Sequence, residues 1–126
     1  MRALNIVESA YRATLEEQDD TIVWLTHAMR GAGASVDLLL RGNAVNYAVR
    51  GQDAGGLEFG RWKQTQPPHI EHDLASLIGK GATVFALRED LDQRGLQGVA
   101  LVDGVKPLGM QALAELMSAY ERVWHW

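Results

Sequence analysis

The chain has 126 residues, a formal charge of −4 and no cysteine, and 47% of its residues are apolar. This is the size of one ordinary globular domain, so we expect a single domain over 1–126. Without cysteine the chain has no disulfide, no thiolate metal site and no cysteine nucleophile. Its lysines and arginines are scattered rather than grouped in a basic stripe, so nucleic acid is not an expected partner.

The same composition argues against a membrane protein. No apolar run approaches the roughly 20 residues that a membrane-spanning helix needs. The first residues, MRALNIVESAYR, lack the apolar core of a signal peptide. We therefore expect no membrane partner and a cytoplasmic location.

The first third of the chain predicts two strands separated by a helix. Residues 2–8 contain β-branched side chains, and 35–41 are almost continuously apolar, which is typical of a strand buried on both faces of a parallel sheet. The helix between them should run to about Arg30, with the acidic residues of 16–20 in its first turn, where carboxylates complement the helix dipole. Its apolar face has helical spacing and consists of Leu15, Ile22, Leu25 and Met29.

The middle of the chain is its least regular part. Residues 43–49 predict a short helix. Segment 50–68 then holds four of the thirteen glycines and two of the three prolines. A loop of this length inside a compact domain is usually functional, mobile or buried in an oligomer.

Helices and strands alternate again in the second half, which completes the predicted fold. Pro68 can open a helix. Strands that alternate with helices favour a parallel sheet covered on both sides. We therefore predict a three-layer α/β/α domain with a flavodoxin-like or Rossmann-like parallel sheet of about five strands. The remaining expected elements are a strand at 82–87, a short helix at 88–95, an extended piece at 105–108, a helix at 110–120 and a terminal strand at 121–126.

Polar side chains follow the first three predicted strands. Because the carboxyl ends of parallel strands meet at one edge of the sheet, we expect these side chains to converge there and to bind a small anion or polar metabolite. The alternative is that they only cap helices and fix turns. The predicted set is Glu8, Ser9, Tyr11 and Arg12 from the first loop, Asn43, Asn46 and Tyr47 from the second, and Arg88 from the third.

Other candidate sites are weaker. His69 and His72 are three residues apart and could share a helical face, but no third ligand follows at a metal-site spacing, so we expect no metal. The acidic run Glu16, Glu17, Asp19 and Asp20 is interpreted as a solvated helical turn. The four tryptophans favour an interface for at least one of them.

The most informative motif is GATVFALREDLDQRGL, residues 81–96. It is similar to a pattern in which a strand ends in Ala-Cys-x-x-x-Leu and a short helix closes on Arg-Gly-Leu. Together with the opening LNIVESAYR and the order of elements, the motif resembles the DsrE/DsrF-like family, small α/β proteins of bacterial sulfur relay, over essentially the whole chain. The matching residues are Ala86, Leu91, Arg94, Gly95 and Leu96, and the family cysteine falls on Leu87.

The resemblance implies a cytoplasmic homo-oligomer, a trimer or hexamer, without a cofactor. Proteins of this family pass sulfane sulfur between cysteines, which Leu87 cannot do because the reaction needs a thiolate. We therefore expect a non-catalytic module that binds a ligand or partner in sulfur metabolism. One alternative is a structural subunit whose neighbour carries the cysteine. Another is a small-molecule enzyme with Glu8 or Tyr11 as proton-transfer group and Arg12 or Arg88 holding an anion.

Overall fold

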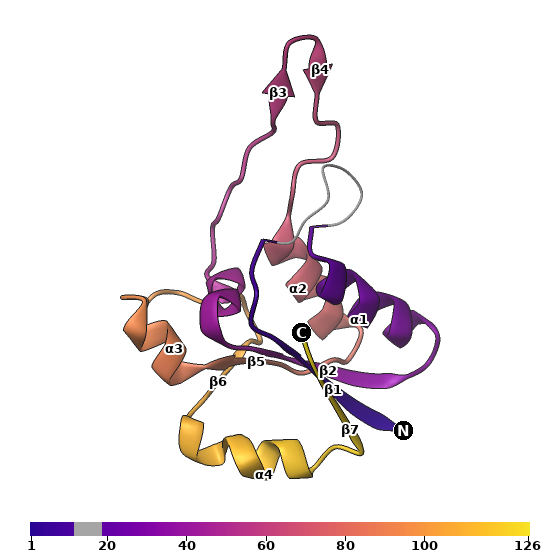
Figure 1. The fold of residues 1–126 in the computed structure, drawn as a ribbon, viewed down its shortest axis with the longest axis vertical. Coiled ribbons are helices and arrows are strands. Elements are labelled where there is room, and N and C mark those ends of the chain that lie inside the picture. The colour runs from indigo at the N-terminus through magenta and orange to yellow at the C-terminus, as the bar shows by residue number, and fades with distance from the viewer. Residues whose placement is uncertain (12–18) are drawn as a thin grey trace.

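A five-stranded parallel sheet forms the centre of the molecule, and the strand order is β6-β5-β2-β1-β7 (Figure 1). The computed structural model describes residues 1–11 and 19–126. The predicted fold class, a three-layer α/β/α domain with a parallel sheet of five strands, is confirmed. The strands are β1 (Arg2–Val7), β2 (Ser35–Leu40), β5 (Val84–Leu87), β6 (Lys106–Leu108) and β7 (Arg122–His125).

The helices divide unequally between the two faces of this sheet. One face carries α1 (Thr21–Gly31), the 3-10 helix η1 (Gly42–Ala48), α2 (Ile70–Gly79) and α3 (Arg88–Gln93). The other face carries only η2 (Met110–Ala112) and α4 (Leu113–Ser118) (Figure 1). The expected single helix over 110–120 is therefore a 3-10 turn followed by a short α-helix.

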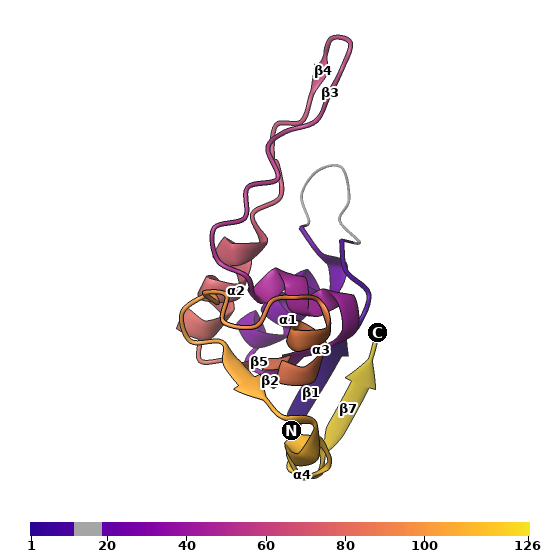
Figure 2. The same ribbon diagram turned by 90° about the vertical axis from the view of Figure 1, so that its left-hand side faces the viewer.

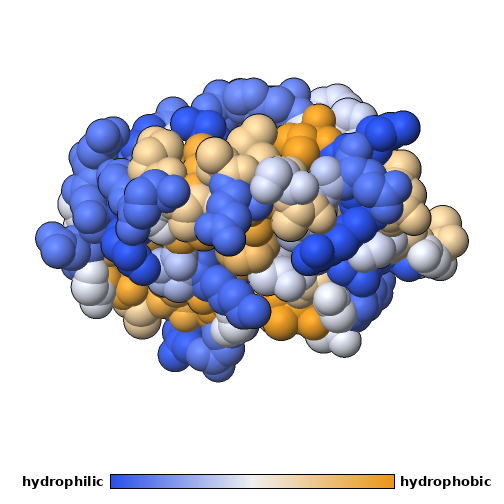
Figure 3. Space-filling model, turned by 90° about the horizontal axis from the view of Figure 1, so that it is seen from below, coloured by the Kyte–Doolittle hydropathy of each residue, from blue (hydrophilic) through white to orange (hydrophobic). Residues whose placement is uncertain are grey.

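Each face of the sheet has its own apolar cluster. Leu38 and Leu40 of β2 face the larger cluster with Leu74 and Leu77 of α2, whereas Leu39 faces the smaller cluster with Tyr120. This alternation follows from the two-residue period of a strand. Apolar side chains remain visible between polar ones on the α4 side (Figure 3). Burial of one such side chain contributes roughly 1.5–3 kcal/mol.

Helix α1 begins later than its sequence pattern predicts. The first turn contains no acidic residue, because Asp20 is the N-cap and accepts hydrogen bonds from the N–H groups of Ile22 and Val23 at 2.8 and 3.1 Å. Aspartate is more favourable at the N-cap than in the helix interior, because its short side chain accepts hydrogen bonds from first-turn N–H groups that have no partner within the helix. The prediction of an acidic first turn was wrong for Asp19 and Asp20. Leu15, Glu16 and Glu17 lie outside the described residues.

Segment 51–67 forms a long projection, which we call the arm. It leaves the body after η1, reverses at Gly60 and returns to α2 (Figures 1 and 2). Its strands β3 (Glu58–Phe59) and β4 (Trp62–Lys63) pair antiparallel with each other and with no strand of the main sheet. The irregular segment predicted at 50–68 is thus a hairpin on two extended legs.

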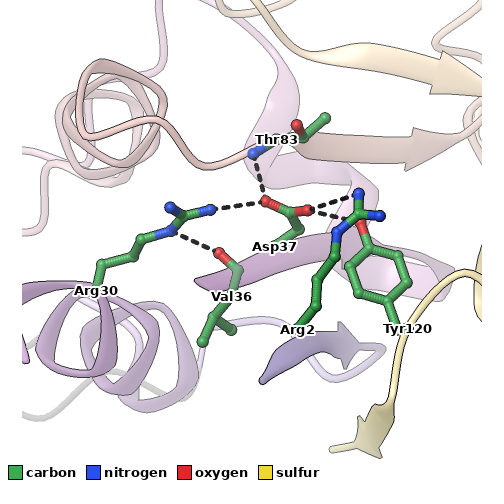
Figure 4. Close-up of polar contacts among 6 residues, drawn as sticks. All are labelled: Arg2, Arg30, Val36, Asp37, Thr83 and Tyr120. Atoms are coloured by element: carbon green, nitrogen blue, oxygen red, sulfur yellow. Dashed lines mark hydrogen bonds and ion pairs between the residues drawn. The ribbon is translucent and has the colours of Figure 1, made fainter. Parts of the chain in front are cut away.

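A buried carboxylate ties the layers together at the opposite end of the sheet. Asp37 of β2 accepts hydrogen bonds from the Thr83 N–H at 2.8 Å, the Arg30 guanidinium at 3.0 Å and the Tyr120 hydroxyl at 2.6 Å (Figure 4). Arg2 lies 3.8 Å from the same carboxylate and stacks over the Tyr120 ring. Burial, and then the neighbouring Asp37, raise the pKa of Tyr120 above its usual range.

In the part of the chain that the structure describes, the helices are too short, or too polar, for any of them to cross a membrane.

Candidate functional site

Two of the predicted site residues, Tyr11 and Tyr47, join the loop after β1 to η1. Tyr47 is 1% exposed, and its hydroxyl donates to Asp20 Oδ2 at 2.6 Å. The same hydroxyl accepts a hydrogen bond from the Tyr11 backbone N–H, and the two rings meet edge to face at 5.3 Å. Asp20 therefore both caps α1 and orients Tyr47, which positions Tyr11. The structure therefore brings Tyr11 and Tyr47 together, as the sequence predicts.

A cavity of about 340 Å³ opens beside these two rings, and we call it the tyrosine pocket. Gln52 lies at its edge, where its Nε2 donates to the carbonyls of Asn46 and Val49 at 2.6 and 3.0 Å. The Tyr11 hydroxyl donates in turn to Gln52 Oε1 at 3.3 Å. The pocket combines aromatic and aliphatic walls with a few polar groups, as small-molecule sites do. Its lining consists of Tyr11, Asp19, Tyr47, Gln52, Asp53, Ala54, Pro68 and Ile70.

The other predicted residues of the first two loops have different positions. Asn43 Oδ1 accepts hydrogen bonds from Arg94 at 2.9 and 3.1 Å, and Asn46 Nδ2 donates to the Asn43 carbonyl at 2.8 Å. These hydrogen bonds stabilise η1 and its contact with α3. The two asparagines therefore fit the alternative interpretation, in which the predicted residues cap helices and fix turns. Ser9 is exposed at the end of β1. Arg12 lies outside the described residues.

Arg88 and Glu8 do not join the tyrosine pocket, although the sequence predicts that they converge there. Arg88 lines a separate cavity of about 320 Å³ together with Leu91 and Pro107. Glu8 pairs with Arg41 at 3.1 Å and lies 3.0 Å from His125. For Arg88 the reason is the strand order: β2 lies between β1 and β5, so the residues that follow β1 and those that follow β5 emerge two strands apart. Glu8, Tyr11 and Arg88 are the described residues of the enzyme alternative, and the structure does not bring them together in one site.

Leu87 is completely buried where β5 meets α3. Its backbone has an extended conformation, and Arg88 begins the helix directly after it. The corner to which the sequence resemblance assigns a cysteine is therefore occupied by an inaccessible aliphatic side chain. No reactive atom of residue 87 reaches solvent.

A second and larger cavity lies between α1 and α2, and we call it the carboxylate pocket. Its volume is about 430 Å³. Asp19 lines both cavities and accepts a hydrogen bond from the His69 N–H at 2.6 Å. The residues around the carboxylate pocket are Asp19, Trp24, His27, Gln66, Pro67, Asp73 and Lys80.

Two carboxyl groups share this second pocket. The pKa of Asp73 is raised to about 7, mainly by burial and then by the hydrogen bond to Asp19 and the negative charge of that carboxylate. His27 Nε2 contacts the Asp73 carbonyl at 2.9 Å, and its Nδ1 lies 3.3 Å from the Lys80 ammonium group. These partners favour the neutral ring with its proton on Nε2, and burial lowers the pKa of His27.

Sequence reasoning missed the carboxylate pocket. It treated Asp19 as part of a solvated turn, and it gave no role to Asp73, which lies on α2. His27 and Asp73 are 46 positions apart, so no motif spacing links them. His69 and His72 do lie side by side, with ring centroids 6.4 Å apart. Across residues 1–11 and 19–126, however, no three potential ligands gather in a way that could hold a metal ion.

Comparisons with known proteins find similarity in structure only. No family model and no curated protein matches the sequence. The crystal structure of the ychN protein from E. coli is 23% identical, each chain covers 100% of the other, and the TM-score is 0.76. A protein of unknown function from Methanobacterium thermoautotrophicum, MTH1491, is 14% identical over 98% of this chain and 97% of its own, with a TM-score of 0.63. Both likenesses span at least 98% of this chain and confirm the predicted α/β fold with a parallel sheet; at these identities they show the fold alone.

Proposed function

We propose that this chain is a non-catalytic binding protein with a DsrE-like fold that takes part in sulfur metabolism through a ligand or a partner. The observation that carries the proposal is the buried Leu87 in a chain without cysteine. Sulfane sulfur needs a thiolate as carrier or nucleophile, and the position that the resemblance assigns to it offers only a methyl-terminated side chain. Because this position cannot carry sulfur, the role that we propose for the chain is binding.

The tyrosine pocket supports the ligand half of this proposal. Its volume of about 340 Å³ lies within the usual range of small-molecule sites. The Tyr11 hydroxyl and the Gln52 amide supply hydrogen-bonding groups, and Ile70 supplies an apolar wall. The proposed ligand is a small polar metabolite. Of the predicted residues, Tyr11 and Tyr47 line this pocket; Ser9 belongs to the loop after β1, and Asn43 and Asn46 belong to η1.

Native mass spectrometry of the protein isolated gently from its own host tests the ligand. We expect an additional small mass on the wild-type chain, lost in Tyr11→Ala because that side chain is exposed and forms the pocket wall. Arg88→Ala is the matched control, since Arg88 lines a separate cavity, and should retain the mass. Absence of any bound mass, or its loss in both variants, contradicts the tyrosine pocket as the binding site. Turnover of a sulfane-sulfur donor by the pure chain contradicts the non-catalytic role.

The arm supports the proposal of a homo-oligomer, a trimer or hexamer. A two-stranded hairpin is at best marginally stable in water unless something covers it. Leu57, Phe59 and Trp62 of the arm are exposed, and the Phe59 and Trp62 rings lie 5.8 Å apart. Aromatic side chains of this kind are favoured at the centres of interfaces. We propose that the arm packs on a second copy of the chain.

Sedimentation equilibrium tests this assembly. The wild-type chain should sediment as an oligomer at micromolar concentration, and the double variant Phe59→Ser/Trp62→Ser should dissociate. Val99→Ser removes an exposed apolar side chain outside the arm and should leave the oligomer intact. A wild-type monomer, or an oligomer that survives the double variant, contradicts the role of the arm. A complex with a cysteine-bearing chain would instead favour the structural-subunit alternative.

A further inference from the structure

The carboxylate pocket has a chemistry that the tyrosine pocket lacks. Its two ends carry opposite charges: Asp19 and Asp73 lie at the start of α2, and Lys80 is the residue that caps the end of this helix. Lys80 is seven positions after Asp73, which corresponds to about 10 Å along the helix axis. Among the described residues no ion pair within 4.0 Å joins Lys80 to either carboxylate. The two charges are therefore held apart across one cavity.

The side chains between these ends suit an alkyl chain and a cation. The indole of Trp24 is half exposed although it belongs to the helix that packs on α2. An indole face binds both methylene groups and ammonium groups. His27 is held by the Asp73 carbonyl and by Lys80, so it forms a fixed wall. The Lys80 ammonium has three donors, of which one is directed at His27.

We infer that the carboxylate pocket binds a small zwitterion in which an alkyl chain joins an ammonium group to a carboxylate. The ammonium group donates to the Asp19 and Asp73 pair, the alkyl chain lies along the Trp24 indole, and the carboxylate accepts a hydrogen bond from Lys80. Charge-assisted hydrogen bonds at both ends select this class over a singly charged ligand. This site is separate from the tyrosine pocket except for Asp19, and the inference does not rest on the proposed function.

Isothermal titration calorimetry with three probes of similar chain length tests the assignment. At pH 8 the full chain should bind 6-aminohexanoate. Hexylamine, which lacks the carboxylate, should bind roughly tenfold more weakly or worse, the factor expected for one lost hydrogen bond to a charged group. Hexanoate should not bind. The inference is overturned if 6-aminohexanoate fails to bind, if hexylamine binds equally well, or if hexanoate binds as tightly.

Variants at the two ends locate the binding site. Asp73→Asn should weaken 6-aminohexanoate and hexylamine alike, by roughly tenfold or more. Lys80→Gln should reduce the affinity for 6-aminohexanoate to that for hexylamine and leave hexylamine unchanged. Asp92→Asn removes an exposed carboxylate that lines a different cavity and should change neither affinity. Binding of 6-aminohexanoate that persists at wild-type strength in Lys80→Gln overturns the inference, even if Asp73→Asn does not fold.

Discussion

Tyr120 and Asp37 are 83 positions apart in the chain, and the hydroxyl of the first donates to the carboxylate of the second at 2.6 Å. This hydrogen bond joins the segment after α4 to the middle strand of the sheet, β2. Arg30 reaches the same carboxylate from α1 on the opposite face (Figure 4). One buried carboxylate thus holds both helical layers against the sheet.

Substitutions in this cluster should lower stability more than their exposed counterparts. Tyr120→Phe removes a hydrogen bond to a charged group and should cost about 1.5–3 kcal/mol. Asp37→Ala leaves the Arg30 guanidinium partly buried without its carboxylate and should cost about 3–5 kcal/mol. Urea denaturation at pH 7 measures both, with Tyr11→Phe as the matched exposed control. A cost for Tyr120→Phe as small as that for the control would contradict the anchoring role.

Asp73 should make the stability of the protein depend on pH. Its pKa is raised from 3.8 to about 7 in the folded state, mainly by burial. The folded state therefore binds a proton more tightly than the unfolded state, so this group lowers stability progressively as pH rises from about 4 to 7. The titratable groups around it are Asp19, His27 and Lys80 in the pocket, with His72 before it on α2.

Asp73→Asn isolates this effect. It should raise the free energy of unfolding at pH 8 by about 1 kcal/mol, a value reduced because the group is only half-buried. It should have little effect at pH 4, where the wild-type carboxyl is already protonated in the fold. Thermal unfolding at the two pH values measures the difference, and Asp92→Asn is the exposed control. Equal effects of Asp73→Asn at pH 4 and pH 8 would rule out the raised pKa.

A thiol introduced at position 87 should be inert. The Leu87→Cys variant places sulfur at a fully buried corner, where burial disfavours the thiolate although the start of α3 favours it. We expect slow reaction with a disulfide reagent, no persulfide with a sulfane donor, and a stability loss of about 1–3 kcal/mol from the smaller side chain. Arg88→Cys, one residue later and exposed, is the reactive control. Comparable rates for the two variants would show that this corner opens to solvent.

The sequence by itself determined the five strands of the main sheet, the positions of the helical segments between them and the fold class. The apolar run of β2 and the spacing of Ile22, Leu25 and Met29 on α1 are local patterns, and a two-residue or 3.6-residue period can be recognised within one element. The role of Asp20 as the N-cap of α1 was missed, because an acidic side chain is favourable both at an N-cap and in a first turn, and only the hydrogen bonds distinguish the two.

The tertiary structure alone decided which polar groups meet. Tyr47 reaches Asp20 across 27 positions and His27 reaches Asp73 across 46, distances in the chain over which no spacing rule operates. Arg88 was expected beside Tyr11 because both follow strands, yet the insertion of β2 between β1 and β5 directs them to separate cavities. Periodicity determines which face of an element is apolar, whereas strand order and packing determine which of the remaining side chains become neighbours.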